Sequence, residues 1–310
     1  MSLPRYQTPL RYPGGKQRLA KFFEELLAAN QLVGGDYVEP YAGGAGIALE
    51  LLRKDVVGKV HLNDASRAIF AFWDSVLNET DTLVRLIHDA TLSIEEWRSQ
   101  REILRRESEF DLLSVGFAFF YLNRCNRSGI PNGGVIGGLQ QTGKWKIDAR
   151  FNKAELIRRI EAVASWKSRI NLTQLDAEIF IKEHLPKLSA TSLVYLDPPY
   201  YVQGNRLYLH HYAPKDHTRV ATLVQASIQQ PWVVSYDAAP AILRLYVAQP
   251  KRITYGLQYS AAQAYRGREV MVFSKDLIVP TASQVTSMNR SLGQLTRRVR
   301  ERSNALCRST

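Results

Sequence analysis

The sequence predicts an α/β domain that is interrupted by a helical and loop insertion. A short strand, a glycine loop, a helix and a second strand follow one another within residues 37–64, which is the order of a βαβ unit. Apolar, strand-like segments return after residue 154. The stretch between the two parts, residues 66–153, first has a helical pattern and then becomes rich in glycine and basic residues.

The first part of the α/β domain is built around its glycine loop. Residues 37–41 form a predicted strand that ends in a turn, and Gly43-Gly44-Ala45-Gly46 follows it. Residues 47–53 carry helix formers and apolar positions suited to packing on a sheet. Residues 59–64 are predicted to form a second buried strand, which ends in the acid Asp64.

The insertion has two halves of different character. Residues 65–109 are predicted to be mainly helical, and we interpret the charged run at 99–108 as a solvated helix face. Residues 123–153 contain six glycines and six basic residues against one acid, with Pro131 and Trp145 among them. This composition predicts a long functional loop or hairpin.

The second part of the α/β domain begins with a predicted helix at 154–163. Predicted strands follow at 170–175, 192–196, 232–235 and 269–273. We therefore expect a discontinuous domain made of residues 1–65 and 154–276, with residues 66–153 as an inserted domain. Residues 277–310 carry six Arg against one Glu, which predicts a basic, flexible tail; an arm that grips a nucleic-acid backbone is the alternative.

Composition narrows the class of protein. The chain has 310 residues, and no stretch approaches the roughly 18 apolar residues of a membrane span. Its start lacks the apolar core of a signal peptide, so we expect a cytoplasmic protein with no membrane partner. Cys125 and Cys307 are far apart and lack nearby ligands, which argues against a disulfide framework and against a metal site. The net charge of +12 favours a polyanionic partner, because Lys and Arg bound to phosphates release counterions.

Asp197-Pro198-Pro199-Tyr200 is the segment most closely tied to chemistry. It follows an apolar strand and so lies at a carboxyl end, where open α/β sheets bind ligands. The Asp197 carboxylate and the Pro198 carbonyl can both accept hydrogen bonds from one planar amine, which favours a nitrogen lone pair that points at an electrophilic methyl group. Tyr200 supplies a face for base stacking. An ordinary strand-terminating turn is the alternative interpretation.

A glycine loop followed by an acid indicates a nucleoside-containing cofactor. Glu39-Pro40-Tyr41 leads into the loop and Asp64 comes about twenty residues later, the layout in which a loop approaches a cofactor while an acid binds ribose hydroxyls. The loop lacks both GxGxxG and a P-loop ending, which disfavours phosphate binding. Asp64 could instead only cap its strand. Upstream, two glycines after Pro13 predict a tight turn that brings Tyr12 close to Lys16.

Together these three elements resemble the Dam-like family of adenine-specific DNA methyltransferases, over most of residues 9–273. The resemblance implies a Rossmann-like S-adenosylmethionine-dependent methyltransferase sheet with a DNA target-recognition insertion. It also implies S-adenosyl-L-methionine as cofactor and double-stranded DNA as substrate, and it leaves a cognate restriction enzyme open as a partner.

Residue roles follow from the resemblance by position in the sequence. Asp197, Pro198, Pro199 and Tyr200 match the family's DPPY motif, which receives the flipped adenine. Asp176 matches the acid that meets the cofactor's adenine, although Ala177 replaces the aromatic that often follows it. The segments 235–237 and 268–271 match later sheet motifs, for which a structural role is expected. The positions matched to cofactor contacts are Tyr12, Lys16, Glu39, Pro40, Tyr41, Gly43, Asp64, Asp176 and Asp197.

The insertion carries the candidates for DNA contact. Residues 121–124 resemble the start of the family's recognition hairpin, whereas residues 125–129 depart from the best-known GATC-reading version, so the target sequence stays open. The candidates for phosphate or base-edge contact are Asn123, Arg124, Arg127, Lys144, Lys146 and Arg150.

The resulting hypothesis is methyl transfer to the exocyclic amine of adenine in duplex DNA, after the base has flipped out of the stack. Two alternatives stay open at this point. One is methylation of another planar amine, such as cytosine, RNA adenine or a glutamine side chain. The other is a DNA-binding protein that has lost catalysis.

Overall fold

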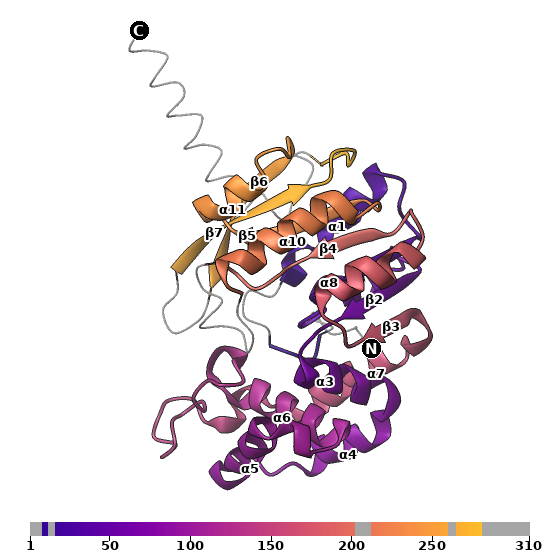
Figure 1. The fold of residues 1–310 in the computed structure, drawn as a ribbon. Coiled ribbons are helices and arrows are strands. Elements are labelled where there is room, and N and C mark those ends of the chain that lie inside the picture. The colour runs from indigo at the N-terminus through magenta and orange to yellow at the C-terminus, as the bar shows by residue number, and fades with distance from the viewer. Residues whose placement is uncertain (1–7, 12–15, 202–211, 260–264, 281–310) are drawn as a thin grey trace.

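The computed structural model describes residues 8–11, 16–201, 212–259 and 265–280 (Figure 1). The predicted cofactor residue Tyr12 and most of the predicted basic tail lie outside these residues. Across the described chain, no helix is long and apolar enough to cross a membrane.

Seven strands of the described chain form one sheet in the order β3-β2-β1-β4-β5-β7-β6. The strands β1, β2, β3, β4 and β5 run parallel, whereas β7 is antiparallel to both β5 and β6. This confirms the predicted α/β class with a mostly parallel, Rossmann-like sheet. The strands are β1 (Asp36–Glu39), β2 (Lys59–Asn63), β3 (Ile170–Thr173), β4 (Leu193–Leu196), β5 (Trp232–Asp237), β6 (Arg252–Tyr259) and β7 (Tyr265–Phe273).

Helices cover both faces of this sheet because the side chains of its strands alternate between two apolar cores. Tyr37 of β1 and Tyr195 of β4 point into the core that includes helices α1 (Ala20–Ala29) and α2 (Gly46–Arg53). Their neighbours Val38 and Val194 point into the opposite core. That second core includes residues of η6 (Phe180–His184), α10 (Pro214–Ser227) and α11 (Pro240–Leu245), and the short helix α8 (Ala177–Ile179) directly precedes η6.

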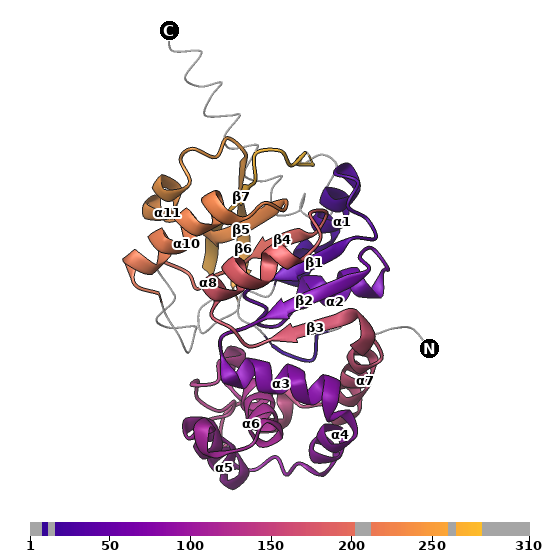
Figure 2. The ribbon, with the colours of Figure 1, turned by 45° about the vertical axis from the view of Figure 1, so that its right-hand side comes forward.

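A helical lobe lies beside the β3 edge of the sheet, as Figures 1 and 2 show. Its centre is α6, in which all residues from Val115 to Asn123 are buried. Gly116 of α6 allows close packing on α3, since a Cβ there would lie 2.5 Å from the Ala71 carbonyl oxygen. The lobe contains α3 (Arg67–Asn78), α4 (Thr80–Asp89), α5 (Ile94–Arg105), α6 (Leu112–Cys125) and α7 (Lys153–Ala164).

Side-chain caps set where these helices begin. Ser66, Ser93, Asp111 and Asn152 each accept a backbone N–H from the first turn of α3, α5, α6 and α7 respectively. The exposed pairs between Arg105 or Arg106 and nearby glutamates agree with a solvated face on the charged run. Short turns complete the described chain: η1 (Lys16–Leu19), η2 (Glu107–Glu109), η3 (Arg127–Gly129), η4 (Ile147–Arg150), η5 (Lys167–Arg169) and η7 (Leu185–Lys187).

Two elements differ from the sequence-based expectation. Helix α7 packs against α3 and α4, so it lies with the helical lobe although its residues belong to the predicted catalytic domain. The physical reason is its apolar stripe, whose residues Leu156, Ile160 and Val163 join the core shared with α3 and α4. Strand β6 was not predicted. The stretch after α6 is mainly loop, with one antiparallel bridge between Asn126 and Val135.

Candidate active site

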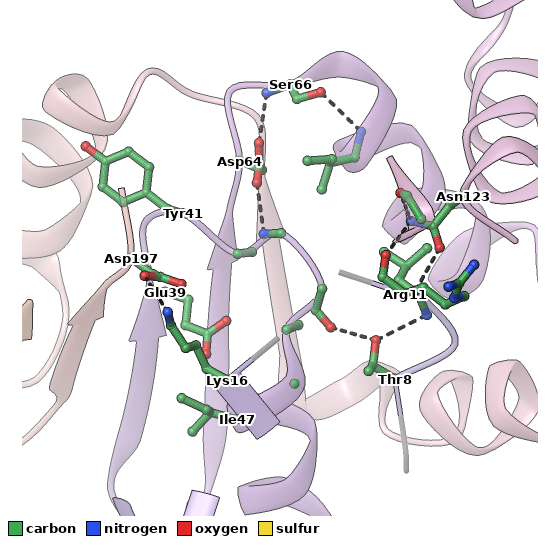
Figure 3. A pocket seen from close by; sticks show the side chains of 18 of the residues that line it. Thr8, Arg11, Lys16, Glu39, Tyr41, Ile47, Asp64, Ser66, Asn123 and Asp197 are labelled. Atoms are coloured by element: carbon green, nitrogen blue, oxygen red, sulfur yellow. Dashed lines mark hydrogen bonds and ion pairs between the residues drawn. The ribbon is translucent and has the colours of Figure 1, made fainter. Parts of the chain in front are cut away.

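A cavity of about 530 Å³ opens where the carboxyl ends of β1 and β4 lie side by side. The chain leaves these neighbouring strands toward opposite faces, which makes this a topological switch point of the sheet. The glycine loop, residues 8–11 and 16–18, the segment after β2, the Asp197 loop and the helical lobe all contribute to its wall (Figure 3). The cavity therefore joins most of the predicted cofactor residues to three of the predicted DNA-binding residues, Asn123, Arg124 and Arg150.

The glycine loop is held open by Asp64. Its carboxylate accepts the Gly43 N–H at 2.9 Å and the Ser66 N–H at 3.0 Å (Figure 3). Gly43 and Ala45 both adopt a positive φ of 47°, so the loop takes its turn even though Ala45 has a Cβ. Asp64 thus accepts hydrogen bonds from the loop and also lines the cavity, and its contact with ribose stays a prediction.

Glu39 ends β1 at the floor of the cavity and is almost fully buried. Burial raises the pKa of its carboxyl to about 8, and the nearby charge of Asp197 acts in the same direction. Glu39 is therefore largely protonated at neutral pH in the protein without ligand. Pro40, Tyr41 and Gly43 line the same wall, as predicted by position.

Asp197 faces the cavity with 19% of its side chain exposed. Its Oδ1 atom accepts a 2.6 Å hydrogen bond from the Ser235 hydroxyl and lies 3.5 Å from the Lys16 ammonium. The Tyr195 hydroxyl is 2.8 Å from the Ser235 oxygen. A chain of hydroxyls from two neighbouring strands thus orients the Asp197 carboxylate.

Lys16 connects Asp197 to two further residues. Its ammonium donates to Glu269 Oε2 at 2.9 Å and also to the Tyr200 hydroxyl. The Tyr200 hydroxyl in turn donates to Glu269 Oε1 at 2.6 Å. Lys16 was predicted to contact the cofactor, whereas its ammonium here is directed at this buried cluster.

Charge within this cluster shifts three pKa values. Burial lowers the pKa of Lys16, but the carboxylates of Asp197 and Glu269 outweigh burial and raise it overall. Burial raises the pKa of Glu269, but Lys16 outweighs burial and lowers it. Burial and the charge of Glu269 raise the pKa of Asp197 despite the attraction of Lys16. The cluster therefore holds one permanent cation between two acids.

The ring of Tyr200 is only 3% exposed and does not line the cavity, so in this structure it offers no open face to a base. Three tyrosines line the cavity instead: Tyr195, which is linked to Asp197 through Ser235, and Tyr41 and Tyr212, whose hydroxyls are 3.2 Å apart. Asp176 caps α8 by accepting the Glu178 N–H, and it is the next residue, Ala177, that lines the cavity.

Arginines from four segments reach the side of the cavity formed by the helical lobe. Arg11, Arg124, Arg150 and Arg159 all line it. Burial and the neighbouring guanidinium groups lower the pKa of Arg124 to about 9, and burial together with Arg150 lowers the pKa of Arg11. Crowded cations of this kind raise the local positive potential and favour an anion such as phosphate.

Asn123, a predicted DNA contact, is buried against the backbone of Arg11 and Gly129. Its side chain is 1% exposed, accepts the Arg11 N–H at 2.7 Å and donates to the Arg11 and Gly129 carbonyls at 2.8 Å each. Three of the four hydrogen bonds that its amide can make go to backbone groups, so Asn123 fixes the loop after α6. It also lines the cavity, and its contact with DNA stays a prediction.

The other basic candidates are exposed but lie apart from the cavity. Arg127 lines a second hollow of about 810 Å³ together with Arg98, Arg101 and Arg105 of α5. Lys144 lies over the ring of Trp145, which is 63% exposed, and Lys146 donates to the Gln141 carbonyl.

Sequence reasoning missed Ser235 and Glu269 as members of the site. Both sit in segments that were assigned a structural role, yet both are polar residues at the ends of otherwise apolar stretches of strand. A buried serine and a buried glutamate in such positions need partners, and that need was the available signal.

Comparison with known proteins gives a matching family model and a similar protein. The family model for D12 class N6 adenine-specific DNA methyltransferases matches residues 12–260. The chain is also similar to the type II methyltransferase M.MjaIII of Methanocaldococcus jannaschii, with 24% identity over 204 residues, which covers 62% of this chain and 68% of the relative. Within the described residues, no group of three or more His, Cys, Asp or Glu side chains could hold a metal ion.

Proposed function

This chain belongs to the family of D12 class N6 adenine-specific DNA methyltransferases, and we propose that its cavity brings S-adenosylmethionine and a flipped adenine together at Asp197. Family membership makes the protein an enzyme that methylates adenine in DNA and requires a methyl donor. The observation that carries the proposal is the single cavity that joins Asp64, Asp197 and the arginines of the helical lobe.

The residues of the cavity fit S-adenosylmethionine as the donor. A volume of about 530 Å³ is in the range of small-molecule sites. Asp64 offers carboxylate oxygens to ribose hydroxyls, and Glu39 and Asp197 offer acidic groups to a cationic ligand. When bound, S-adenosylmethionine supplies an electrophilic methyl group on a sulfonium centre. The matched residues Lys16, Pro40, Tyr41 and Gly43 complete the proposed cofactor wall, and Asp176 is assigned to its outer edge.

Asp197 and Pro198 perform the catalytic positioning in this proposal. The carboxylate and the Pro198 carbonyl accept the two N–H groups of the adenine amine, so that the nitrogen lone pair turns toward the methyl group. A bound S-adenosylmethionine would supply the methyl carbon for the new N–C bond and leave as a neutral thioether, and Asp197 would accept the proton that the amine releases. Tyr200 contributes its ring face to the base, and because this ring is 3% exposed, the incoming base must displace the groups that cover it.

The helical lobe and the loop after it are proposed as the DNA target-recognition domain. Arg124 and Arg150 line the cavity next to the position of the flipped nucleotide, which suits contact with the phosphates beside it. Arg127, Lys144 and Lys146 are exposed farther along the loop and suit contact with the flanking duplex. We propose residues 1–65 and 154–276 as the catalytic domain and residues 66–153 as the inserted target-recognition domain. Helix α7 of the catalytic domain packs on the helical lobe. A cognate restriction enzyme is proposed by analogy with the type II relative.

Transfer of a labelled methyl group from S-adenosylmethionine into duplex DNA tests the proposal. Asp197→Ala is expected to abolish incorporation while the variant keeps its fold, its thermal transition and its DNA affinity. The matched control is Asp89→Ala, which removes an exposed carboxylate of α4 and should leave incorporation unchanged. Full activity of Asp197→Ala would refute the assigned role.

A further inference from the structure

We propose that Glu269 is a positioning residue for methyl transfer, because it holds the Lys16 ammonium and so keeps the Asp197 carboxylate available to the amine. This inference rests on the proposed function. It assigns a specific task to a residue in a segment for which the sequence suggested only a structural role.

Glu269 is a fully buried carboxylate on the antiparallel strand β7. It receives three charged or hydroxyl donors: Lys16 at 2.9 Å, the Tyr200 hydroxyl at 2.6 Å and the Tyr255 hydroxyl at 2.6 Å. These donors come from η1, from the loop after β4 and from β6, so Glu269 is the point where three distant segments meet. A buried carboxylate with this many donors is stable as an anion.

The position of Lys16 shows how Glu269 affects Asp197. The ammonium is 2.9 Å from the nearest Glu269 oxygen and 3.5 Å from the nearest Asp197 oxygen. One cation between two anions leaves a net charge of about −1 on the cluster. Without the charge of Glu269, the ammonium would be attracted to Asp197 alone, and the resulting ion pair would neutralise the carboxylate that must accept the adenine amine.

The orientation of Asp197 agrees with this division of contacts. Among the described residues, Ser235 and Lys16 both contact its Oδ1 atom. This leaves Oδ2 for the substrate amine. If the charge of Glu269 were removed, Lys16 could move closer to Asp197. Its ammonium has three N–H donors, so it would then compete with the amine for Oδ2.

Few titratable groups surround Asp197, and burial and charge determine the protonation state of each. Burial raises the pKa of each nearby tyrosine, so all of them stay neutral. Glu39 is largely protonated below about pH 8. Lys16 and Glu269 therefore dominate the charge felt by Asp197. The titratable groups that face Asp197 from the surrounding elements are Lys16, Tyr37, Glu39, Tyr195, Tyr236, Tyr255 and Glu269.

The experiment measures single-turnover methyl transfer against pH for Glu269→Gln, for Lys16→Met and for the double variant. Glu269→Gln keeps the shape of the side chain and removes its charge. The rate is expected to fall on the order of 100-fold, as for a misplaced catalytic group. The acid limb of its pH profile should move to lower pH by roughly one unit, because Asp197 loses an anionic neighbour and gains a closer cation.

The double variant separates positioning from simple structural damage. If Glu269 acts through Lys16, then removing Lys16 as well should recover part of the rate lost in Glu269→Gln, a coupling that independent sites do not show. The double variant also leaves no unpaired buried charge from this pair, so it keeps the test valid if Glu269→Gln alone folds poorly. Glu183→Gln, an exposed carboxylate on η6, is the charge-matched control.

Two results would overturn the inference. One is a Glu269→Gln enzyme with the wild-type rate and an unmoved acid limb; the other is a double variant whose losses simply add. Asp197→Ala is measured in parallel. If that variant is active, the proposed function itself fails; if it is inactive while Glu269→Gln behaves as the wild type, only the role of Glu269 fails.

Discussion

The Ser235 hydroxyl on β5 donates a 2.6 Å hydrogen bond to Oδ1 of Asp197 at the end of β4. Since Ser235 donates its hydroxyl proton to Asp197, it must act as the acceptor toward Tyr195. The Tyr195 hydroxyl, 2.8 Å away, therefore donates to the Ser235 oxygen. The parallel pairing of β4 with β5 brings the three residues together. The orientation of the Asp197 carboxylate thus depends on a neighbouring strand.

Ser235→Ala should shift the pH dependence of methylation. A hydrogen bond donated to a carboxylate favours its ionised form, and Ser235 lowers the pKa of Asp197 in this way. In the proposed mechanism ionised Asp197 is the active form. Loss of the Ser235 hydroxyl should therefore move the acid limb of the single-turnover rate to higher pH, with a rate about tenfold lower at neutral pH. This shift is opposite in sign to that expected for Glu269→Gln. Tyr195→Phe, which spares the Ser235 bond, should have the same sign and a smaller size; an unmoved acid limb in Ser235→Ala would contradict the assignment.

Glu39→Gln should stabilise the ligand-free protein in a pH-dependent manner. Burial raises the pKa of Glu39 to about 8, above the value of an unfolded glutamate. The protonated acid therefore favours the folded state below the unfolded pKa, and this contribution is lost as the pH rises through about 8. The variant should match the wild type in thermal unfolding near pH 4.5 and gain up to a few kcal/mol (~3) near pH 9. Equal stability of the two proteins at both pH values would show that Glu39 is not buried in this state.

Asp64→Ala should weaken binding of S-adenosylmethionine. The variant leaves the N–H groups of Gly43 and Ser66 without their acceptor and removes the proposed ribose contact. Loss of such hydrogen bonds costs about 1–3 kcal/mol, so calorimetry should find an affinity lower by roughly 10- to 100-fold. Asp64→Asn keeps one acceptor oxygen, so its affinity for S-adenosylmethionine should lie between those of the wild type and Asp64→Ala. Wild-type affinity in Asp64→Ala would limit Asp64 to capping.

Gly129→Ala should disturb the loop after α6. Gly129 has a φ of 75°, and a Cβ there would lie 2.3 Å from the Arg11 carbonyl oxygen. We expect a stability loss of about 1–3 kcal/mol in denaturant unfolding, together with weaker DNA binding because Arg11 moves. Gly134→Ala is a control within the same loop, since a Cβ there meets nothing within 4 Å. Similar behaviour of the two variants would count against this account.

Arg124→Gln should weaken DNA binding evenly across sequences. If Arg124 contacts a phosphate, the slope of log affinity against log salt should decrease by about one unit. Arg158→Gln removes an exposed guanidinium that pairs with Glu155 on α7, and it should change the slope little. A change of sequence preference with an unchanged salt slope would instead assign Arg124 to base contact.

Local patterns were enough to predict much of the fold. The strands β1, β2, β4 and β5 and the helices α2 and α7 are all near their expected positions, because their apolar periodicity and glycine punctuation are encoded within a few residues. The family and the adenine substrate were likewise predicted from the order of motifs, and the family match confirms both. The role of the Asp197 loop stays a prediction. Strand β6 was missed although its apolar residues recur at every second position from Ile253 to Tyr259, which is the period-two pattern typical of a strand.

The sequence by itself determined the family and predicted most of the proposed site residues, whereas the tertiary structure decided what each of them touches and added Ser235 and Glu269 to the site. Lys16 and Glu269 are 253 positions apart, and no local pattern relates them; their contact exists because η1 and β7 converge on the end of β4. The same convergence buries Tyr200 and turns Asn123 toward the backbone of Arg11. Burial is the physical reason, since a polar group removed from water must find a partner, and only the packed fold determines which partner is within reach.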